Sequence, residues 1–483
     1  MIMQVSYSIL QSSSFFVECF RETMPLLIAA LLLYLYYKQR ISIIDTLLYA
    51  FASEAYTMLA IGPTFTATFF VSTFICIEQA HRLFTGGQHI RREYLLLLLL
   101  PLLSHITVFL VTQLYKDPFN YPGGRYYAFY TKPLYFYIKT YLPLFAIGSR
   151  IVQERTPLSW DAFCETMKRI TKISLCIATL QIFIQLTFQN VALSEILGLQ
   201  SRYLAQQISG PLGLRVQAWF GEPKVFSAFL SLAIPILVKD KEYKIAGAAF
   251  VVGILTASQT FYINLLVAGV VFVIFGRLNG VRLKILCTLG LIIGIFMTVA
   301  ASKDYLLKHY MANRNDPVYK ALFERSAYRY DNEIWQKNNI VLGMPLQRDM
   351  ELPVVDFLRD EPYLLLSGYG AGNSTFIPPS YFFGQPLYEF RVAGVGGHNL
   401  NMRWFFILAE FGGVALVFFF LILTRVGSGV LLFQRSYFAF VAVCFFFSQI
   451  DLIMIIVAML GAYGTAPAQE PLYEKDIRLA WGR

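Results

Sequence analysis

Two short segments combine residue types that could bind and transfer a phosphate-linked group. Residues 210–223 read GPLGLRVQAWFGEP, which puts Arg215 shortly before Glu222 at the start of an apolar run. The fork of an arginine matches phosphate oxygens with two hydrogen bonds, and a carboxylate can accept a proton from a reacting hydroxyl. Pro223 suits the first turn of a helix, so Glu222 could instead only stabilise that helix start.

The second segment, residues 394–413, reads GVGGHNLNMRWFFILAEFGG and contains one of only five histidines. His398 can exchange a proton near neutral pH, and Asn399 could cap the helix that follows. Arginines that converge on one cavity are typical of a site for a polyanion such as pyrophosphate. Four of them accompany this histidine in the sequence: Arg325 and Arg329, which share one helix face, and Arg391 and Arg403.

Ionisable side chains inside apolar segments are costly, so they indicate a function or an internal pair. Lys139 lies inside such a segment, ~10 Å along the helix from its expected outer end, and we count it among the substrate-binding candidates. Snorkelling is the plain alternative for this lysine. Asp45 is close enough to a segment end to be interfacial, and Glu410 and Asp451 could form structural pairs.

The sequence contains no pattern for a nucleotide or a metal. Walker A, DxD and HExxH motifs are all missing from it, and its six cysteines form no CxxC pair or Cys/His cluster. We therefore expect no metal and no cofactor.

The composition indicates that helices in a membrane position these residues. Of 483 residues, 57% are hydrophobic and 14% are charged, whereas soluble domains carry about 25% charged residues. The sequence predicts an all-α, polytopic membrane helix bundle with about eleven to thirteen transmembrane helices. Residues 4–20 are an interfacial helix or one further span. The other apolar segments lie near 22–37, 41–61, 64–78, 94–114, 132–149, 173–188, 223–238, 244–257, 260–276, 284–301, 402–424 and 436–463.

The basic residues predict how these helices are oriented. One set of alternate short loops carries eighteen Lys and Arg residues and is expected to be cytoplasmic, so the net charge of +10 is no sign of nucleic-acid binding. Loops 116–131, 189–222 and 302–401 are then extracytoplasmic. Three parts follow: an N-terminal bundle over 1–301, a large loop over 302–401, and C-terminal transmembrane helices with a tail over 402–483. The loop is expected to begin as a helix over 303–337 and to fold back over the bundle in its second half.

Three of these segments resemble bacterial O-antigen polymerases and ligases. RVQAWFGEPKVFSAFLSLAIPIL (215–237) resembles the family's Arg…Gly-Glu-Pro helix start, and GILTASQTFYINLLVAG (253–269) its Leu-Thr-x-Ser-Arg turn. LLLSGYGAGNS (364–374) with HNLNMRWFFILAEFGG (398–413) is similar to the end of the family's large periplasmic loop. Gln259 stands where that turn often has an arginine, a departure that favours the polymerase over the ligase.

The resemblance implies a metal-independent glycosyltransferase of the GT-C type, a multi-pass protein of the bacterial inner membrane with its large loop in the periplasm. A polymerase would transfer the growing glycan from undecaprenyl pyrophosphate to a new lipid-linked repeat unit. Membrane lipids and a chain-length regulator protein are expected partners, and nucleic acid is not. A ligase that transfers the glycan to lipid A–core is the near alternative, and a lipid-linked oligosaccharide flippase is the alternative from another class. The catalytic candidates are Arg215, Glu222 and His398, and the substrate-binding candidates are Lys139, Arg325, Arg329, Arg391, Asn399 and Arg403.

Overall fold

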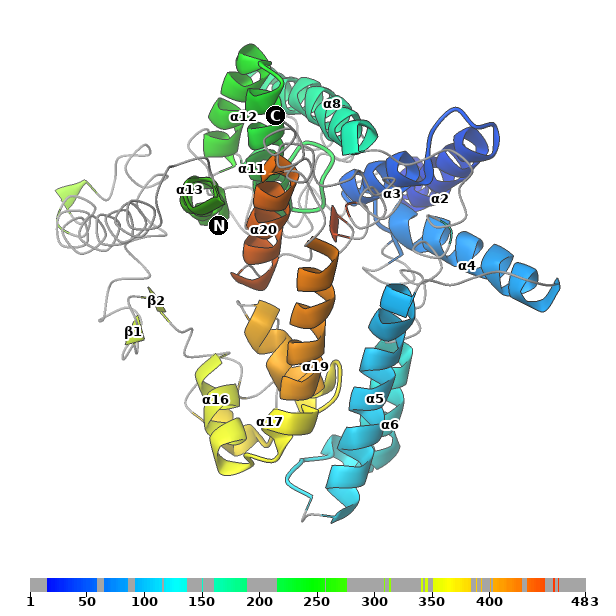
Figure 1. Ribbon diagram of the computed structural model, residues 1–483, viewed down its shortest axis with the longest axis vertical. Coiled ribbons are helices and arrows are strands. Elements are labelled where there is room, and N and C mark those ends of the chain that lie inside the picture. Colours follow the sequence, from blue (N-terminus) through cyan, green and yellow to red (C-terminus); the bar gives the residue numbers. More distant parts are fainter. Residues whose placement is uncertain are drawn as a thin grey trace, which may run out of the picture.

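The chain is almost entirely helical where its structure is described, so the predicted all-α class is confirmed (Figure 1). The exception is a short antiparallel pairing of β1 (Ile340–Val341) with β2 (Met344–Pro345). The computed structural model describes residues 15–58, 65–85, 92–114, 117–136, 150, 160–188, 215–256, 258–275, 308, 312–313, 340–341, 344–345, 351–383, 388, 392, 400, 403–427, 432–447, 455–456 and 459.

The N-terminal helices overlap the apolar segments, but the first, fifth and sixth of them begin well before the predicted residues, and one segment is cut short. They are α2 (Phe15–Tyr37), α3 (Ile43–Ala52), α4 (Ala67–Thr85), α5 (Arg92–Leu114), α6 (Tyr126–Phe136) and α8 (Trp160–Phe188). The single span expected over 41–61 is wrong, because α3 ends at Ala52. Beyond it the chain is extended, and Thr57 forms a β-bridge with Thr66.

The central helices begin and end where the turn residues predict. They are α11 (Pro223–Lys239), α12 (Tyr243–Leu255) and α13 (Gln259–Phe275), followed after a gap by α19 (Arg403–Gly427) and α20 (Leu432–Phe447). Pro223 occupies the first turn of α11, where its missing N–H costs nothing. The expected tight turn between α12 and α13 is confirmed by their bounds.

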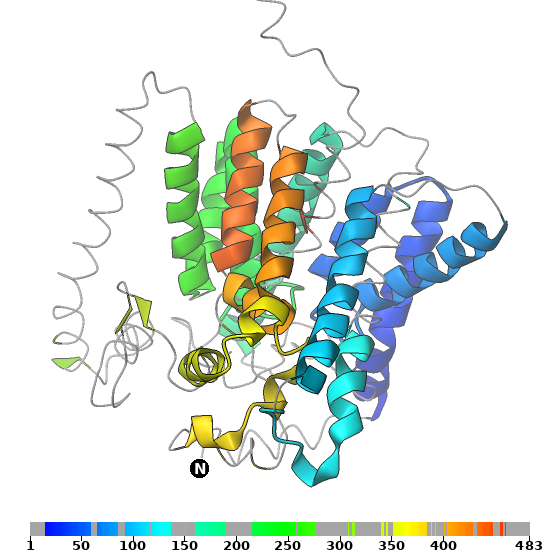
Figure 2. The same ribbon diagram turned by 60° about the horizontal axis from the view of Figure 1, so that its bottom comes forward.

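Two contacts fix which helix termini share an end of the bundle. The Trp160 and Tyr437 rings, at the N-termini of α8 and α20, lie 5.4 Å apart. The ammonium of Lys168, also near the start of α8, lies 2.8 Å from a carboxylate oxygen of Asp240 at the C-terminus of α11. We call this the Lys168 end. The start of α11 and the end of α12 therefore lie at the opposite end, which Figure 2 shows to carry the yellow 351–383 segment.

The helix α19 turns sharply at Gly412, and we call the end of the bundle where it turns the Gly412 end. Gly412 has a φ of 88° and a ψ of 166° inside the helix, a conformation open only to glycine. The Arg403 guanidinium carbon lies 6.0 Å from the Phe445 ring, and the Phe419 ring lies 5.6 Å from the same ring. In a straight helix, Arg403 and Phe419 would be about 24 Å apart along the axis, so the two halves of α19 fold toward each other.

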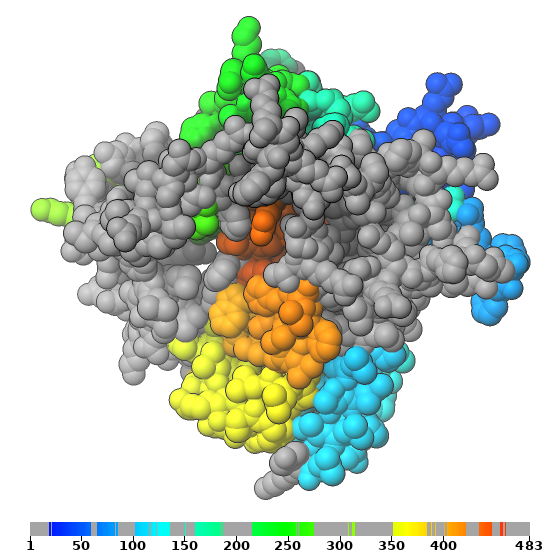
Figure 3. Space-filling model, in the orientation of Figure 1, coloured from blue at the N-terminus to red at the C-terminus, as the bar shows by residue number. Residues whose placement is uncertain are grey.

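The second half of the large loop packs onto the bundle, as its sequence predicts. It forms α16 (Glu351–Asp360), α17 (Leu364–Ser367), and the 3-10 turns η3 (Asn373–Phe376) and η4 (Pro379–Phe382). Ser104 of α5 donates a hydrogen bond from Oγ to the Ser367 carbonyl over 3.0 Å. Figure 3 shows this yellow segment forming one continuous surface with the orange α19 and the cyan α5 and α6. The helix expected over 303–337 and the span over 284–301 lie outside the described residues, apart from Lys308, Ala312 and Asn313.

Apolar and polar side chains are distributed in an unusual way over the described helices. Large apolar side chains are exposed on several of them, for example Leu31 of α2, Val251 of α12 and Leu421 of α19. Hydroxyl and amide side chains are buried instead, and Asn264 donates from Nδ2 to Ser231 Oγ over 2.9 Å between α13 and α11. One stretch among the described residues, Arg403–Leu421, is long and apolar enough by itself to cross a membrane, and it contains the bend at Gly412.

Candidate functional site

Arg215 links two of the segments that resemble the polymerase and ligase family, residues 215–237 and 253–269, in the interior of the bundle. Its side chain is 1% exposed, and its Nε donates a hydrogen bond to the Thr256 carbonyl over 3.0 Å. The Val216 amide also donates to the Leu255 carbonyl over 3.3 Å. Thr256 caps the C-terminus of α12, where the partial negative charge of a helix end attracts a cation. Arg215 is therefore enclosed by protein, with its guanidinium at the C-terminus of α12.

Glu222 stands at the start of α11, as the sequence predicts. It is the N-cap residue, with a φ of −149° and a ψ of 149°, and its carbonyl accepts the first helical hydrogen bond, from Phe226. Its half-buried side chain makes no capping hydrogen bond. Any stabilisation of the helix start by the Glu222 side chain is therefore electrostatic, without a capping hydrogen bond.

Side chains from α8 support the backbone between Arg215 and Glu222. The Gln181 Oε1 atom accepts hydrogen bonds from the Gln217 and Ala218 amides, each over 3.2 Å. The Trp219 indole donates to Ser174 Oγ over 2.8 Å. A non-helical strip of chain is therefore held inside the bundle.

Residues 364–374, which begin the third of these segments, cross α19 at its bend. The Tyr369 and Gly370 amides donate to the carbonyls of Ala409 and Glu410 over 2.9 Å and 3.0 Å. The Gly372 amide donates to the Glu410 carboxylate over 2.9 Å. The backbones approach so closely at Gly412 that a Cβ there would lie 2.1 Å from the Leu366 carbonyl oxygen. The Gly-rich sequence thus permits a backbone crossing that any side chain would prevent.

Helix α6 fixes the same crossing through two hydrogen bonds. Asn373 donates from Nδ2 to the Phe129 carbonyl of α6 over 3.0 Å, and Lys132 of α6 donates from Nζ to Thr375 Oγ1 over 2.9 Å. The buried Glu410 carboxylate lies within the electrostatic influence of Arg403 and Lys132. These contacts assemble one carboxylate and two cations at the Gly412 end of the bundle.

Arg403 stacks on aromatic rings in the bent half of α19. Its guanidinium carbon lies 4.9 Å from the Phe406 ring centroid, a distance at which cation–π attraction operates. Of the predicted site residues, the structure therefore places Arg215 and Glu222 on one strip of chain and Arg403 on α19. The remaining six lie outside the described residues: Lys139, Arg325, Arg329, Arg391, His398 and Asn399.

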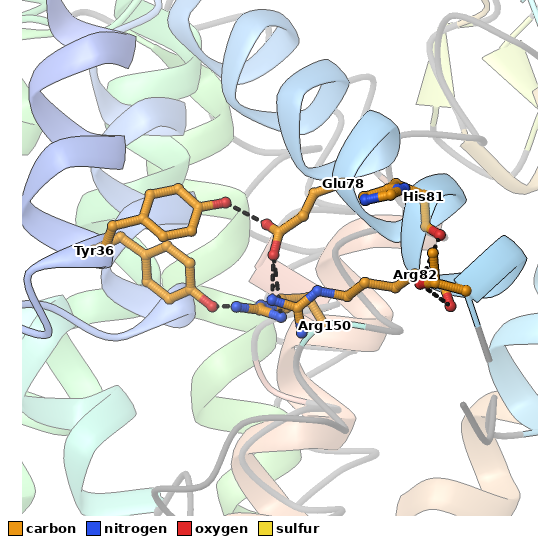
Figure 4. A network of polar contacts seen from close by, with 7 residues as sticks. Tyr36, Glu78, His81, Arg82 and Arg150 are labelled. Atoms are coloured by element: carbon orange, nitrogen blue, oxygen red, sulfur yellow. Dashed lines mark hydrogen bonds and ion pairs between the residues drawn. The ribbon is translucent and has the colours of Figure 1, made fainter. Parts of the chain in front are cut away.

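A separate set of charges on α2 and α4 pairs Glu78 with two arginines. Glu78 of α4 accepts a hydrogen bond from the Tyr37 hydroxyl and pairs with Arg82 (Figure 4). It also lies 3.5 Å from Arg150, which donates from Nε to the Tyr36 hydroxyl over 2.6 Å. This network shares no residue with the contacts around Arg215 or Gly412, so it is distinct from the candidate site.

Sequence reasoning missed three polar residues at the site. Lys132 and Asn373 lie far apart in the sequence and meet only through the crossing at Gly412, so no local pattern could pair them. Gln217 sits inside a motif that its charged members Arg215 and Glu222 define, and its burial cannot be read from the sequence. Comparison with family models, with curated proteins and with solved structures finds no match.

Proposed function

We propose that this protein is an integral membrane glycosyltransferase that polymerises undecaprenyl-pyrophosphate-linked repeat units at the periplasmic face of the inner membrane. One observation carries the proposal. Arg215 is held inside the bundle by the C-terminus of α12, on the strip of chain that leads directly to Glu222 at the start of α11. A fixed positive charge and a carboxylate thus belong to one non-helical strip of chain, at the same end of the bundle as the Gly412 crossing.

Surface and composition support the membrane part of this proposal. Apolar side chains on the outside of the described helices suit a lipid environment, whereas polar side chains such as Asn264 and Ser231 bond one another inside the bundle. Only 14% of the residues are charged, too few to cover a soluble protein of this size. In the orientation that the basic residues of the short loops predict, the Lys168 end is cytoplasmic and the Gly412 end is periplasmic.

The chemistry needs no added activation, because a sugar pyrophosphate already carries a good leaving group. The acceptor hydroxyl oxygen forms a bond to the anomeric carbon as the bond from that carbon to the pyrophosphate oxygen breaks. The hydroxyl proton passes to a base, for which Glu222 and His398 are the proposed groups. Negative charge develops on the departing pyrophosphate, and fixed cations stabilise it. Arg215 and Arg403 are the proposed cations, assisted by Lys139, Arg325, Arg329 and Arg391.

The turn between α12 and α13 favours a polymerase within this class. Thr256, whose carbonyl receives Arg215, lies just before this turn, and Gln259 begins α13. An arginine at position 259 would be typical of the ligase-like turn, and with glutamine there the positive charge beside this turn comes from Arg215. We therefore propose a repeat unit as the acceptor, in place of lipid A–core.

Complementation in cells tests this function. In a strain that lacks the gene, the wild-type chain should restore a ladder of long polysaccharide on a gel, and Arg215→Ala should reduce long-chain product at least ~10-fold, the loss expected for one charge-assisted contact. Arg359→Ala is a matched control, because its side chain is 71% exposed and pairs only on the surface of α16. A normal ladder from Arg215→Ala at wild-type protein level would exclude Arg215 from the reaction.

A further inference from the structure

We infer that Gln217 is a substrate-binding residue whose amide group hydrogen-bonds the sugar next to the pyrophosphate. This inference rests on the proposed function and adds a substrate contact beyond Arg215 and Glu222. Gln217 lies two residues after Arg215, on the strip of chain between α12 and α11.

The side chain of Gln217 is fully buried with its polar atoms unused. It is 0% exposed, and neither its Nε2 nor its Oε1 has a hydrogen-bond partner among the described residues. Nearly all buried side-chain amides in proteins are bonded, so an unbonded one calls for a specific reason. Gln181 illustrates the usual case, because its Oε1 accepts two backbone hydrogen bonds.

The backbone beside Gln217 is strained as well. Ala218 has a φ of 51°, a left-handed conformation that costs a non-glycine residue free energy and that tends to occur at functional sites. Surrounding contacts hold it in place, including the bond from the Trp219 indole to Ser174 and the bond from the Ala55 amide to the Trp219 carbonyl over 3.0 Å. Irregular backbone deep in a membrane protein is tolerated where it lines a cavity or is enclosed by protein.

The chemistry of Gln217 and of Arg215, two residues before it, indicates the ligand. A carboxamide offers two donors and one acceptor without charge, which suits neighbouring sugar hydroxyls. A guanidinium suits phosphate oxygens. Gln217 and Arg215 together therefore fit a sugar bonded directly to a pyrophosphate, which is the reacting end of the proposed donor.

Replacing Gln217 with leucine separates binding from folding. An apolar side chain of similar size removes the buried polar atoms, so the unfolding temperature of Gln217→Leu should not fall below that of the wild type. Its KM for undecaprenyl-pyrophosphate repeat units should rise at least ~10-fold, the factor for each 1.4 kcal/mol of binding. Gln79→Leu is the matched control, because Gln79 is also buried with an unpartnered Nε2 but belongs to α4. Its KM should not change.

The outcomes are distinguishable. A wild-type protein that extends no repeat units would contradict the proposed function, and this inference with it. If the wild type is active and Gln217→Leu keeps a wild-type KM, only the inference is overturned. Should Gln217→Leu fold poorly, Gln217→Met provides a second variant with an unbranched chain. Wild-type KM in a destabilised Gln217→Met protein would assign Gln217 a purely structural role.

Discussion

The buried carboxylate of Glu410 shows how one side chain can stabilise an irregular backbone. Its oxygen accepts the Gly372 amide over 2.9 Å, in the loop that crosses α19. The sequence indicates only a structural pair for this residue, because the partner is a backbone amide that no pattern of charged residues can reveal. The position of Glu410 next to Gly412 makes it part of the crossing itself.

Substituting Glu410 should separate the hydrogen bond from the charge. Glu410→Leu leaves the Gly372 amide without an acceptor, so we expect it to lower the free energy of unfolding by about 1–3 kcal/mol. Glu410→Gln keeps an acceptor oxygen and should cost less. Thermal unfolding of the purified variants measures both. Equal stability of Glu410→Leu and the wild type would show that the bond to Gly372 contributes nothing.

Lys168 provides a pH-dependent contribution at the other end of the bundle. Burial opposes its charged form, but hydrogen bonds to Asp240 and Glu165 outweigh that effect and raise the pKa of Lys168. Because the folded pKa lies above the unfolded value of about 10.4, the stabilisation is complete below that pH and is lost as the pH rises through the folded pKa. Stability should therefore show no Lys168-dependent change between about pH 6 and pH 9.

Substitution tests that contribution. Lys168→Met should lower the free energy of unfolding at pH 7 by about 1–3 kcal/mol, and the difference from wild type should shrink above pH ~10.5. Lys172→Met is the control, because Lys172 is 48% exposed and forms one ion pair, with Glu242. An exposed pair contributes about 1 kcal/mol or less. A cost for Lys168→Met no larger than for Lys172→Met would contradict the structural role of Lys168.

Among the elements, helix positions were predictable and bends were not. Apolar runs and Pro223 predict α11, α12 and α13 closely, because hydrophobicity and turn chemistry are local properties. The shortening of α3 and the bend in α19 arise from contacts with distant segments. Trp219 meets the chain just beyond α3, and α17 crosses α19 at Gly412. Hydropathy alone registers both segments as continuous spans.

The bend at Gly412 should be intolerant of any side chain. A Cβ at this position would overlap the Leu366 carbonyl, and the φ of 88° with ψ of 166° is itself strained for other residues. We expect Gly412→Ala to lower the free energy of unfolding by about 3 kcal/mol or more. Gly247→Ala in α12 is the control, because nothing lies within 4 Å of its Cβ position, and helix propensity favours alanine there by up to ~1 kcal/mol. Equal melting of the two variants would argue against the crossing.

In the whole molecule, the proposed function requires the two ends of the bundle to face different compartments. Ser380 is exposed in the segment at the Gly412 end, and Lys244 is exposed at the start of α12, at the Lys168 end. In a variant without native cysteines, Ser380→Cys should react with a membrane-impermeant thiol reagent in intact spheroplasts. Lys244→Cys should react only after lysis. The reverse pattern would invert the orientation, and labelling of both in intact cells would argue against a membrane-spanning bundle.

The proposed function requires that the protein itself extends lipid-linked repeat units. Its most direct test is reconstitution of the purified chain in lipid with undecaprenyl-pyrophosphate repeat units as the only substrate. The account predicts polymer without lipid A–core or nucleotide, and the same yield in the presence of EDTA. Transfer that occurs only when lipid A–core is added would make the protein a ligase. Movement of labelled lipid across the bilayer without any transfer would make it a flippase, and either result would contradict the account.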